Sequence, residues 1–249
     1  MNPLLIAHRG ARLEAPENTI PAFARAIELG ADGIEFDVRL TKDRVPIISH
    51  DEHLHDERGR QISVSATPYE VLRKIDIGAR KGDAFRGTVV PTLEEVLTFL
   101  APHDLQLIVE IKRQSDLHDD AVRRVGDAIK RAPLKRAPVV SSASRRIHQA
   151  LYRQHRDLQR ALIVLEPLFS FVPSLLFAKF YGLQGLHLEV SGLKKMFVRA
   201  CHRLGLQCDI WTVKLARQAH HAVQCGVDAI IVDDVALIRR ELEALAAGC

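Results

Sequence analysis

The chain has 249 residues, of which 47% are hydrophobic and 27% charged, and its 35 Lys and Arg slightly outnumber its 31 Asp and Glu, for a net charge of +4. This composition excludes a disordered, collagen-like or coiled-coil chain. The basic pairs are scattered and lack interleaved aromatic residues, so nucleic-acid binding is not expected. The length suits either one α/β barrel of about 250 residues or two smaller domains.

Short apolar runs rich in β-branched residues alternate with helical segments along almost the whole chain. The predicted strands span residues 4–8, 33–40, 105–111, 138–141, 161–165, 185–190, 207–213 and 228–233. The predicted helices span residues 19–29, 93–100, 119–131, 144–154, 170–180, 193–204, 215–225 and 236–246. Strands that are each followed by a helix, eight times over, predict a (β/α)8 TIM barrel. A doubly wound sheet is the alternative, because it shows the same alternation.

The chain contains no Ser- or Gly-rich linker, so residues 1–249 are predicted to form a single domain. Residues 51–91 interrupt the alternation with a charged loop, a weak helix at 68–75 and a Gly-rich segment. We interpret these residues as a small insertion at the mouth of the barrel.

A ninth strand-like run, residues 45–50, follows the second strand after a link that is too short for a parallel crossover. We therefore expect it to return antiparallel, as a hairpin arm. If Asp43 and Arg44 form a two-residue loop, His50 lies directly opposite Asp37. Pro46 fits only an edge strand, which such an arm would be.

Several features bear on where the protein resides. Cys201, Cys208, Cys225 and Cys249 show no C-x-x-C spacing, which predicts reduced thiols in a reducing compartment. The N-terminus has no basic region and only a short apolar run, so no signal sequence is expected. The apolar tract 167–181 falls short of the roughly 20 residues of a membrane span, although it could lie on a membrane surface. These features predict a cytoplasmic protein without a transmembrane segment and leave peripheral membrane contact possible.

Carboxylates collect at the carboxyl ends of the predicted strands, where barrel active sites lie. Glu35 and Asp37 share one face of the second strand, and Glu110 arrives from the next strand. Three buried acids that meet at one point repel one another unless a cation neutralises them. A hard divalent cation, Mg²⁺ or Ca²⁺, is expected there. The alternative is that nearby Arg and Lys side chains pair with these acids.

Two histidines and two cations reach the same rim. His8 ends the first strand and His50 ends the hairpin, so one could accept a proton from a nucleophile while the other donates one to a leaving oxygen. Arg9 and Lys112 make the metal-loaded site net positive, which suits an anionic phosphate. Together these residues indicate metal-assisted phosphoester hydrolysis.

Other residues also lie near this rim. Trp211, late on the seventh strand, is predicted to form an apolar wall over the substrate, with a place in the barrel core as the alternative. His187, Glu189 and Asp233 also end at the rim and could support the reacting groups.

Seven segments along the chain together resemble the glycerophosphodiester phosphodiesterase family. They are Ala7-His8-Arg9-Gly10, Pro16-Glu17-Asn18-Thr19, Gly33-Ile34-Glu35-Phe36-Asp37-Val38, Pro46-Ile47-Ile48-Ser49-His50-Asp51, Glu110-Ile111-Lys112, and Trp211-Thr212-Val213 with Gly226-Val227-Asp228. The chain departs from the family pattern at Lys214, at 232–235 and at 141–143, which affects the rim around the leaving alcohol.

The resemblance implies a (β/α)8 barrel with a small insertion after the hairpin. It also implies that Glu35, Asp37 and Glu110 bind a divalent cation, that His8 and His50 are the acid and base, and that Arg9 and Lys112 contact phosphate. Glu17 and Asn18 would support His8 and Arg9. The implied substrates are small molecules, deacylated phospholipids such as glycerophosphocholine, which would be cleaved to glycerol 3-phosphate and an alcohol.

Two other functions remain as alternatives. The apolar tract 168–180 would suit a lysophospholipase D that acts on acylated lysophospholipids at a membrane surface. A non-catalytic barrel that only binds phosphodiesters is disfavoured, because all three acids and both histidines are present. The choice between Mg²⁺ and Ca²⁺, the preferred alcohol and the oligomeric state are left open.

Overall fold

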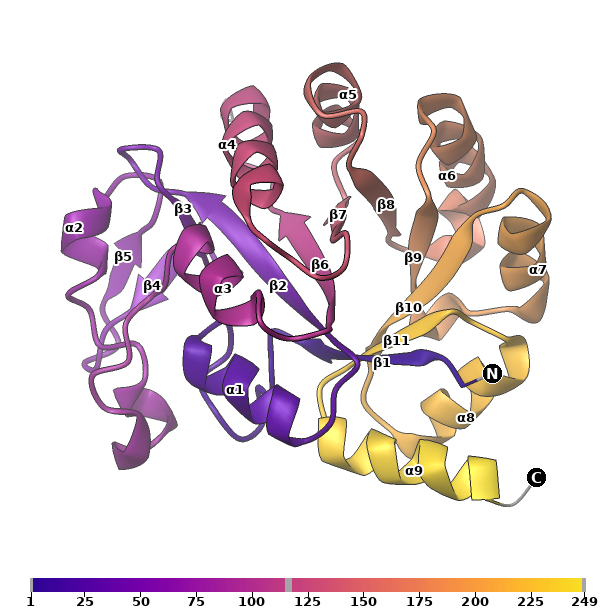
Figure 1. The fold of residues 1–249 in the computed structure, drawn as a ribbon, viewed down its shortest axis with the longest axis horizontal. Helices are drawn as coiled ribbons and strands as arrows, with labels where there is room; N and C mark the ends of the chain where they lie inside the picture. The colour runs from indigo at the N-terminus through magenta and orange to yellow at the C-terminus, as the bar shows by residue number, and fades with distance from the viewer. Residues whose placement is uncertain (1, 115–117, 248–249) are drawn as a thin grey trace.

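Eight parallel strands close into a barrel in the computed structural model, which describes residues 2–114 and 118–247 (Figure 1). The barrel strands are β1 (Leu4–His8), β2 (Gly33–Leu40), β6 (Gln106–Ile111), β7 (Val139–Ser142), β8 (Gln159–Val164), β9 (Gly185–Glu189), β10 (Gln207–Val213) and β11 (Ala229–Val232). Neighbours in the chain are neighbours in the barrel, and β1 pairs with both β11 and β2 to close it. The predicted (β/α)8 barrel is confirmed, and the doubly wound alternative is wrong.

Helices surround this barrel on its outer side. They are α1 (Ile20–Glu28), α3 (Leu93–Leu100), α4 (His118–Arg131), α5 (Arg145–Gln154), α6 (Pro167–Tyr181), α7 (Lys195–Arg203), α8 (Ala216–Cys225) and α9 (Val235–Ala247). Thr92 and Glu95 form a capping box that begins α3 at the predicted residue. Helix α6 begins three residues earlier than predicted, because Pro167 at its first position has a φ suited to a helix start.

No helix among residues 2–114 and 118–247 is long and apolar enough to cross a membrane. Cys201, Cys208 and Cys225 are buried and free, and Cys249 lies outside the described residues.

The alternation of side chains along β2 directs the acids into the barrel. Ile34, Phe36 and Val38 belong to the main hydrophobic core, which fills the space between strands and helices. Because successive side chains of a strand point to opposite faces, Glu35 and Asp37 face the barrel interior. A separate small cluster of Ile6, Ile108, Ala229 and Ile231, packed against Trp211, fills the inside of the barrel.

The hairpin arm forms as expected, but its register differs by one residue. Strand β3 (Pro46–Ile48) pairs antiparallel with β2 at the edge of the sheet, with Leu40 opposite Pro46. The loop has three residues, since Thr41 N donates to Val45 O at 3.1 Å and Arg44 adopts a left-handed φ of 66°.

Asp37 therefore lies opposite Ser49, whose N–H donates to Asp37 O at 2.9 Å, and the predicted pairing of Asp37 with His50 is wrong. Strand β3 ends at Ile48, so the alternation of side chains along a strand does not set the direction of His50. Its side chain lines the cavity at the site despite the shift in register.

The insertion has a small hydrophobic cluster of its own. It contains β4 (His53–His55), β5 (Gln61–Ser63), α2 (Tyr69–Leu72), η1 (Ala79–Lys81) and η2 (Asp83–Phe85). The hairpin of β4 and β5 was not predicted, because three-residue strands show too little alternation to recognise. Leu54, Val64, Tyr69 and Leu72 pack together beneath it.

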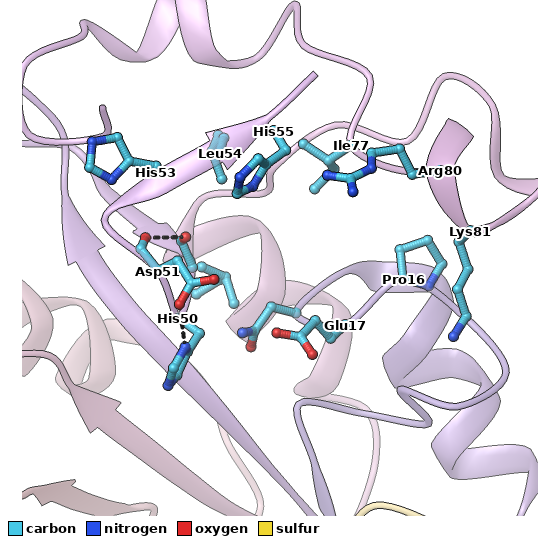
Figure 2. A pocket seen from close by; sticks show the side chains of 13 residues that line it. Pro16, Glu17, His50, Asp51, His53, Leu54, His55, Ile77, Arg80 and Lys81 are labelled. Atoms are coloured by element: carbon cyan, nitrogen blue, oxygen red, sulfur yellow. Dashed lines mark hydrogen bonds and ion pairs between the residues drawn. The ribbon is translucent and has the colours of Figure 1, made fainter. Parts of the chain in front are cut away.

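A hollow of 390 Å³ separates the insertion from the barrel, with His53, His55 and Arg80 on one side and His50 and Glu17 on the other (Figure 2).

Candidate active site

The three predicted acids meet at the carboxyl end of the barrel. Glu35 and Asp37 lie on β2 and Glu110 on β6, where Asp37 and Glu110 are register partners. One carboxylate oxygen from each lies within 4.8 Å of the other two, a spacing that one metal ion could bridge. Glu35 and Asp37 are almost completely buried, which makes their mutual repulsion costly.

The surroundings of these acids perturb their titration strongly. Burial, followed by the charges of Asp37 and Glu110, raises the pKa of Glu35 well above its usual range. Burial and Asp37 likewise raise the pKa of Glu110. Burial would also raise the pKa of Asp37, but Lys112, Arg9 and His50 outweigh it and hold that pKa at about 2. The cluster therefore holds its full negative charge only if more positive charge is supplied.

Two cations lie against the same acids. Lys112 Nζ is 2.8 Å from Asp37 Oδ1 and 2.8 Å from Glu110 Oε1. Arg9 Nε is 3.1 Å from Asp37 Oδ2. No side-chain nitrogen of a Lys or Arg lies within 4.0 Å of a Glu35 carboxylate oxygen among the residues described, and the backbone N–H of Arg9 donates to Glu35 Oε2 at 3.3 Å.

The alternative in which the acids are neutralised by pairing thus holds for Asp37 and Glu110 but fails for Glu35. A buried carboxylate without a cationic partner, beside two others, fits the oxygen-rich ligand set of a hard divalent cation.

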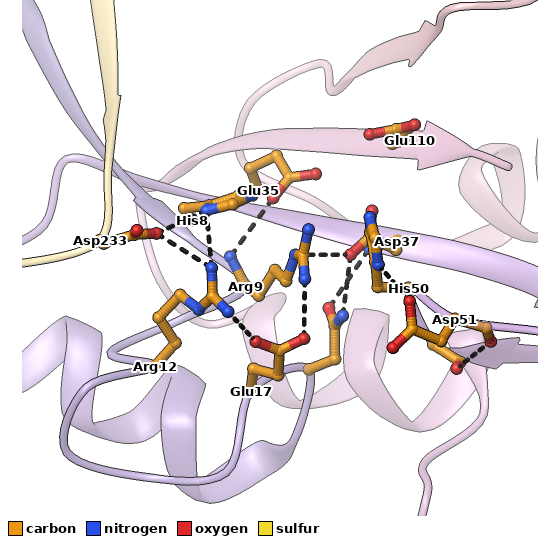
Figure 3. Close-up of polar contacts among 12 residues, drawn as sticks. His8, Arg9, Arg12, Glu17, Glu35, Asp37, His50, Asp51, Glu110 and Asp233 are labelled. Atoms are coloured by element: carbon orange, nitrogen blue, oxygen red, sulfur yellow. Dashed lines mark hydrogen bonds and ion pairs between the residues drawn. The ribbon is translucent and has the colours of Figure 1, made fainter. Parts of the chain in front are cut away.

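His8 is held from behind by a carboxylate at the end of the last strand. Its Nδ1 lies 2.7 Å from Asp233 Oδ1, and Arg12 Nη1 donates to the same oxygen at 3.2 Å (Figure 3). This contact fixes the ring and directs Nε2 away from Asp233. Burial lowers the pKa of His8, while the hydrogen bond that His8 Nδ1 makes to Asp233 opposes that shift.

His50 is oriented in the same way by a different carboxylate. Its Nδ1 lies 2.7 Å from Asp51 Oδ1, at a more exposed position than His8. Burial lowers the pKa of His50, and Asp37 opposes this shift. Both histidines therefore have one ring nitrogen bound to an acid and the other available to a reacting group.

Glu17 and Asn18 lie beneath the site. Arg9 Nη1 donates to Glu17 Oε1 at 2.7 Å, so Glu17 supports Arg9 as expected. Asn18 Nδ2 instead donates to Asp37 Oδ2 at 2.8 Å, and it orients an acid of the cluster rather than His8. The chain after Arg9 packs closely against α1 at Gly10, where an added Cβ would lie 2.7 Å from the backbone of Ala22. The φ of Gly10 is 79°, which also favours glycine there.

A cavity of 270 Å³ collects these side chains at the mouth of the barrel. Seven of the eight predicted site residues line it: His8, Arg9, Glu35, His50, Glu110, Lys112 and Trp211. The eighth, Asp37, lies just below, bonded to Lys112 and Arg9. Trp211 Nε1 donates to His187 O at 3.1 Å, which leaves its ring as part of the cavity wall.

Sequence reasoning missed the roles of some contacts. Asp233 is predicted only as a rim residue that could support the reacting groups, without His8 as its partner. Arg12 is not predicted, although its Nη2 lies 2.5 Å from Glu17 Oε2 and its Nη1 lies 3.2 Å from Asp233 Oδ1, so that it links the two acids. His8 and Asp233 are 225 positions apart, and only closure of the barrel brings them together. The adjacency of Asp51 to His50 was a usable signal, because a carboxylate next to a histidine often orients its ring.

The chain is similar to known phosphodiesterases over nearly its full length. Residues 8–237 match the model of the glycerophosphoryl diester phosphodiesterase family. A glycerophosphodiester phosphodiesterase from Caldanaerobacter subterraneus is 32% identical over 234 residues, covering 94% of this chain and 95% of that protein.

Two solved structures share the fold. A glycerophosphodiester phosphodiesterase from Parabacteroides distasonis is 26% identical, with a TM-score of 0.81 and 98% of both chains covered. A phosphodiesterase from Oleispira antarctica, solved in complex with the product sn-glycerol-3-phosphate, is 23% identical, with a TM-score of 0.90 and 97% of both chains covered.

Proposed function

The chain belongs to the glycerophosphoryl diester phosphodiesterase family, and from this membership we propose that it hydrolyses glycerophosphodiesters to sn-glycerol 3-phosphate and an alcohol. The observation that carries the proposal is the meeting of two histidines, two cations and an acidic cluster at one cavity. A non-catalytic barrel would need none of this convergence. The substrate is a small anionic molecule, in keeping with a cavity of 270 Å³.

The acids Glu35, Asp37 and Glu110 would hold one divalent cation, Mg²⁺ or Ca²⁺. When bound, such an ion polarises phosphoryl oxygens and offsets their negative charge. Support for this assignment comes from Glu35, whose buried carboxylate has no cationic side-chain partner among the described residues.

Arg9 and Lys112 would bind the non-bridging oxygens of the substrate phosphate. Both lie at the cavity, and both are fixed by carboxylates on their inner side. An arginine can donate two parallel hydrogen bonds to a phosphate, and a lysine supplies a point charge as negative charge develops. Trp211 would lie beside the substrate as an apolar wall.

His8 and His50 would transfer the protons. Each has its Nδ1 bound to an acid, Asp233 or Asp51, which leaves Nε2 to accept or donate a proton in the cavity. One histidine takes a proton from the nucleophile, either water or the glycerol 2-hydroxyl, and the other protonates the departing alcohol. If the 2-hydroxyl attacks, the two histidines exchange roles in the second step, when water opens the cyclic phosphate.

We also propose that residues 1–249 form a single catalytic domain and that the protein resides in the cytoplasm. Three buried free cysteines, Cys201, Cys208 and Cys225, favour a reducing compartment. Fractionation of the source cells, with the enzyme detected in each fraction, tests this location.

A matrix of metals and substrates tests the proposed activity. Protein stripped with a chelator is supplied with Mg²⁺, Ca²⁺ or neither, and is given glycerophosphocholine, glycerophosphoethanolamine or a lysophospholipid. We expect sn-glycerol 3-phosphate from the deacylated substrates only when a metal is present. Cleavage of the lysophospholipid alone, to lysophosphatidic acid and its head-group alcohol, would favour the lysophospholipase D alternative. No cleavage in any combination would contradict the proposal.

A further inference from the structure

Helix α6 is apolar on the side that faces the solvent as well as on the side that faces the barrel. Phe171 and Ala178 pack inward, Phe171 against Phe197 of α7. The outward side carries exposed apolar residues at nearly every turn: Leu168, Phe169, Val172, Leu176 and Phe180. Phe169 and Phe180 are 83% and 79% exposed. A continuous apolar surface of this kind on a folded protein marks an interaction site.

The apolar surface extends to the active-site cavity. Leu165, between β8 and α6, is 54% exposed and also lines the cavity with His8 and His50. One turn further along, Leu168 and Phe169 begin the outward face of α6. Whatever covers α6 therefore lies next to the opening through which a substrate enters.

Positive charge surrounds this helix. Residues 144–204, which contain α5, α6 and α7, hold ten Lys and Arg against three Asp and Glu, a net charge of +7, whereas the whole chain carries +4. The remaining residues together carry −3. The three helices lie side by side in Figure 1. Nine of the ten cations are exposed: Arg145, Arg146, Arg153, Arg156, Lys179, Lys194, Lys195, Arg199 and Arg203.

Few of these cations are neutralised. Of the nine exposed cations, only Arg153 has an acidic partner within 4.0 Å among residues 2–114 and 118–247, and that partner is Asp119. Arg145 lies over the ring of Phe177 on α6, at 5.2 Å from its centroid, so a cation borders the apolar surface directly. An apolar stripe bordered by unpaired cations is the pattern of a helix that lies on an anionic membrane.

The charge also decides between two possible occupants. A second copy of this chain would bring one surface of +7 against another, and the repulsion would oppose association. An anionic bilayer would attract the same surface while accepting the apolar side chains. With 15 residues, α6 is too short to span a bilayer but can lie in its interface.

We propose that α6 docks on the surface of an anionic lipid bilayer, with Phe169 and Phe180 inserted among the headgroups and the flanking cations in contact with anionic lipids. This docking does not depend on the proposed hydrolysis. It places the opening of the cavity beside the membrane.

Co-sedimentation of the full chain with vesicles tests the docking. Vesicles of phosphatidylcholine alone are compared with vesicles that also contain phosphatidylglycerol, at low and at high salt. The parent should sediment with the anionic vesicles at low salt and be released by high salt. F169E/F180E should bind at least about tenfold more weakly, since both side chains are exposed and their replacement leaves the core intact.

Val71→Glu is the matched control, because Val71 is also an exposed apolar residue but lies on α2, on the opposite side of the barrel in Figure 1. It should bind as the parent does, and circular dichroism should show all three proteins folded. The proposal is overturned if the parent stays in solution at low salt, or if it binds both kinds of vesicle equally. It is overturned as well if F169E/F180E binds the anionic vesicles as tightly as the parent does. It is also overturned if ultracentrifugation shows a dimer that F169E/F180E converts to a monomer.

Discussion

The replacement Asp233→Asn tests whether the carboxylate behind His8 supports proton transfer. Asp233 Oδ1 lies 2.7 Å from His8 Nδ1, and both side chains are largely buried. A hydrogen bond to a charged group contributes about 1.5–3 kcal/mol, which corresponds to about 10- to 150-fold in rate at about 1.4 kcal/mol for each factor of ten. An amide can also donate to Nδ1, which would favour the wrong tautomer of the ring.

We therefore expect kcat/KM for glycerophosphocholine to fall by about 10- to 150-fold, from the hydrogen-bond energy above. The pKa of His8 should fall as well, because burial lowers it and the contact with Asp233 currently opposes that shift. The limb of the pH profile that His8 controls should therefore move to lower pH. The assay is steady-state release of sn-glycerol 3-phosphate over a range of pH.

Glu241→Gln is the matched control for this experiment. Glu241 Oε2 lies 2.8 Å from His220 Nε2, in a pair of the same chemistry on α8 and α9, outside the cavity. It should leave both the rate and the pH profile unchanged. If Asp233→Asn retained the parental rate within twofold and the same profile, the proposed support of His8 would be refuted.

Three further predictions concern the charge cluster and the stability of the fold. Lys112→Met removes the ammonium that lies 2.8 Å from Asp37 and from Glu110, and it should lower kcat by about 10²- to 10³-fold in steady-state assays. Glu35→Gln should weaken binding of Mg²⁺ or Ca²⁺ by at least about tenfold in calorimetry, since it removes a charged oxygen ligand. Burial lowers the pKa of His148 from 6.5 to about 4, so between these values only the unfolded chain binds the proton. The free energy of unfolding, measured with urea, should therefore decrease by up to about 3 kcal/mol as the pH falls from 6.5 to 4.

A control variant or a specified result could contradict each of the three predictions. Lys130→Met removes an exposed lysine that pairs with Asp157 at 2.8 Å, and it should leave kcat unchanged; an equal loss in both variants would contradict the role of Lys112. Calorimetry in which Glu35→Gln binds metal like the parent would remove Glu35 from the ligand set. His148→Gln should reduce the dependence of stability on pH, and an unchanged slope would show that other groups produce it.

The barrel and its acids were predictable because both follow from short-range patterns. The alternation along β2 sets Ile34, Phe36 and Val38 toward the helices, and it therefore sets Glu35 and Asp37 inward. Parallel strands also end at one rim, so residues far apart in the chain could be placed together without knowing their distances.

The features that could not be predicted depend on the conformation of a loop and on a contact between residues far apart in the sequence. The hairpin register was missed by one residue, because the bonds of the Thr41 hydroxyl to Asp43 and Val45 and the left-handed conformation of Arg44 favour a three-residue loop. The link between His8 and Asp233 exists only once β1 pairs with β11. No periodicity of the sequence encodes either feature.

The most direct test of hydrolysis at this site compares the metal-loaded parent with His8→Ala and His50→Ala in the release of sn-glycerol 3-phosphate from glycerophosphocholine. The parent should release it, and each variant should be slower by at least about 10²-fold, the contribution typical of a positioned acid or base. Parental rates in both variants, with all three proteins folded, would contradict catalysis by these two histidines.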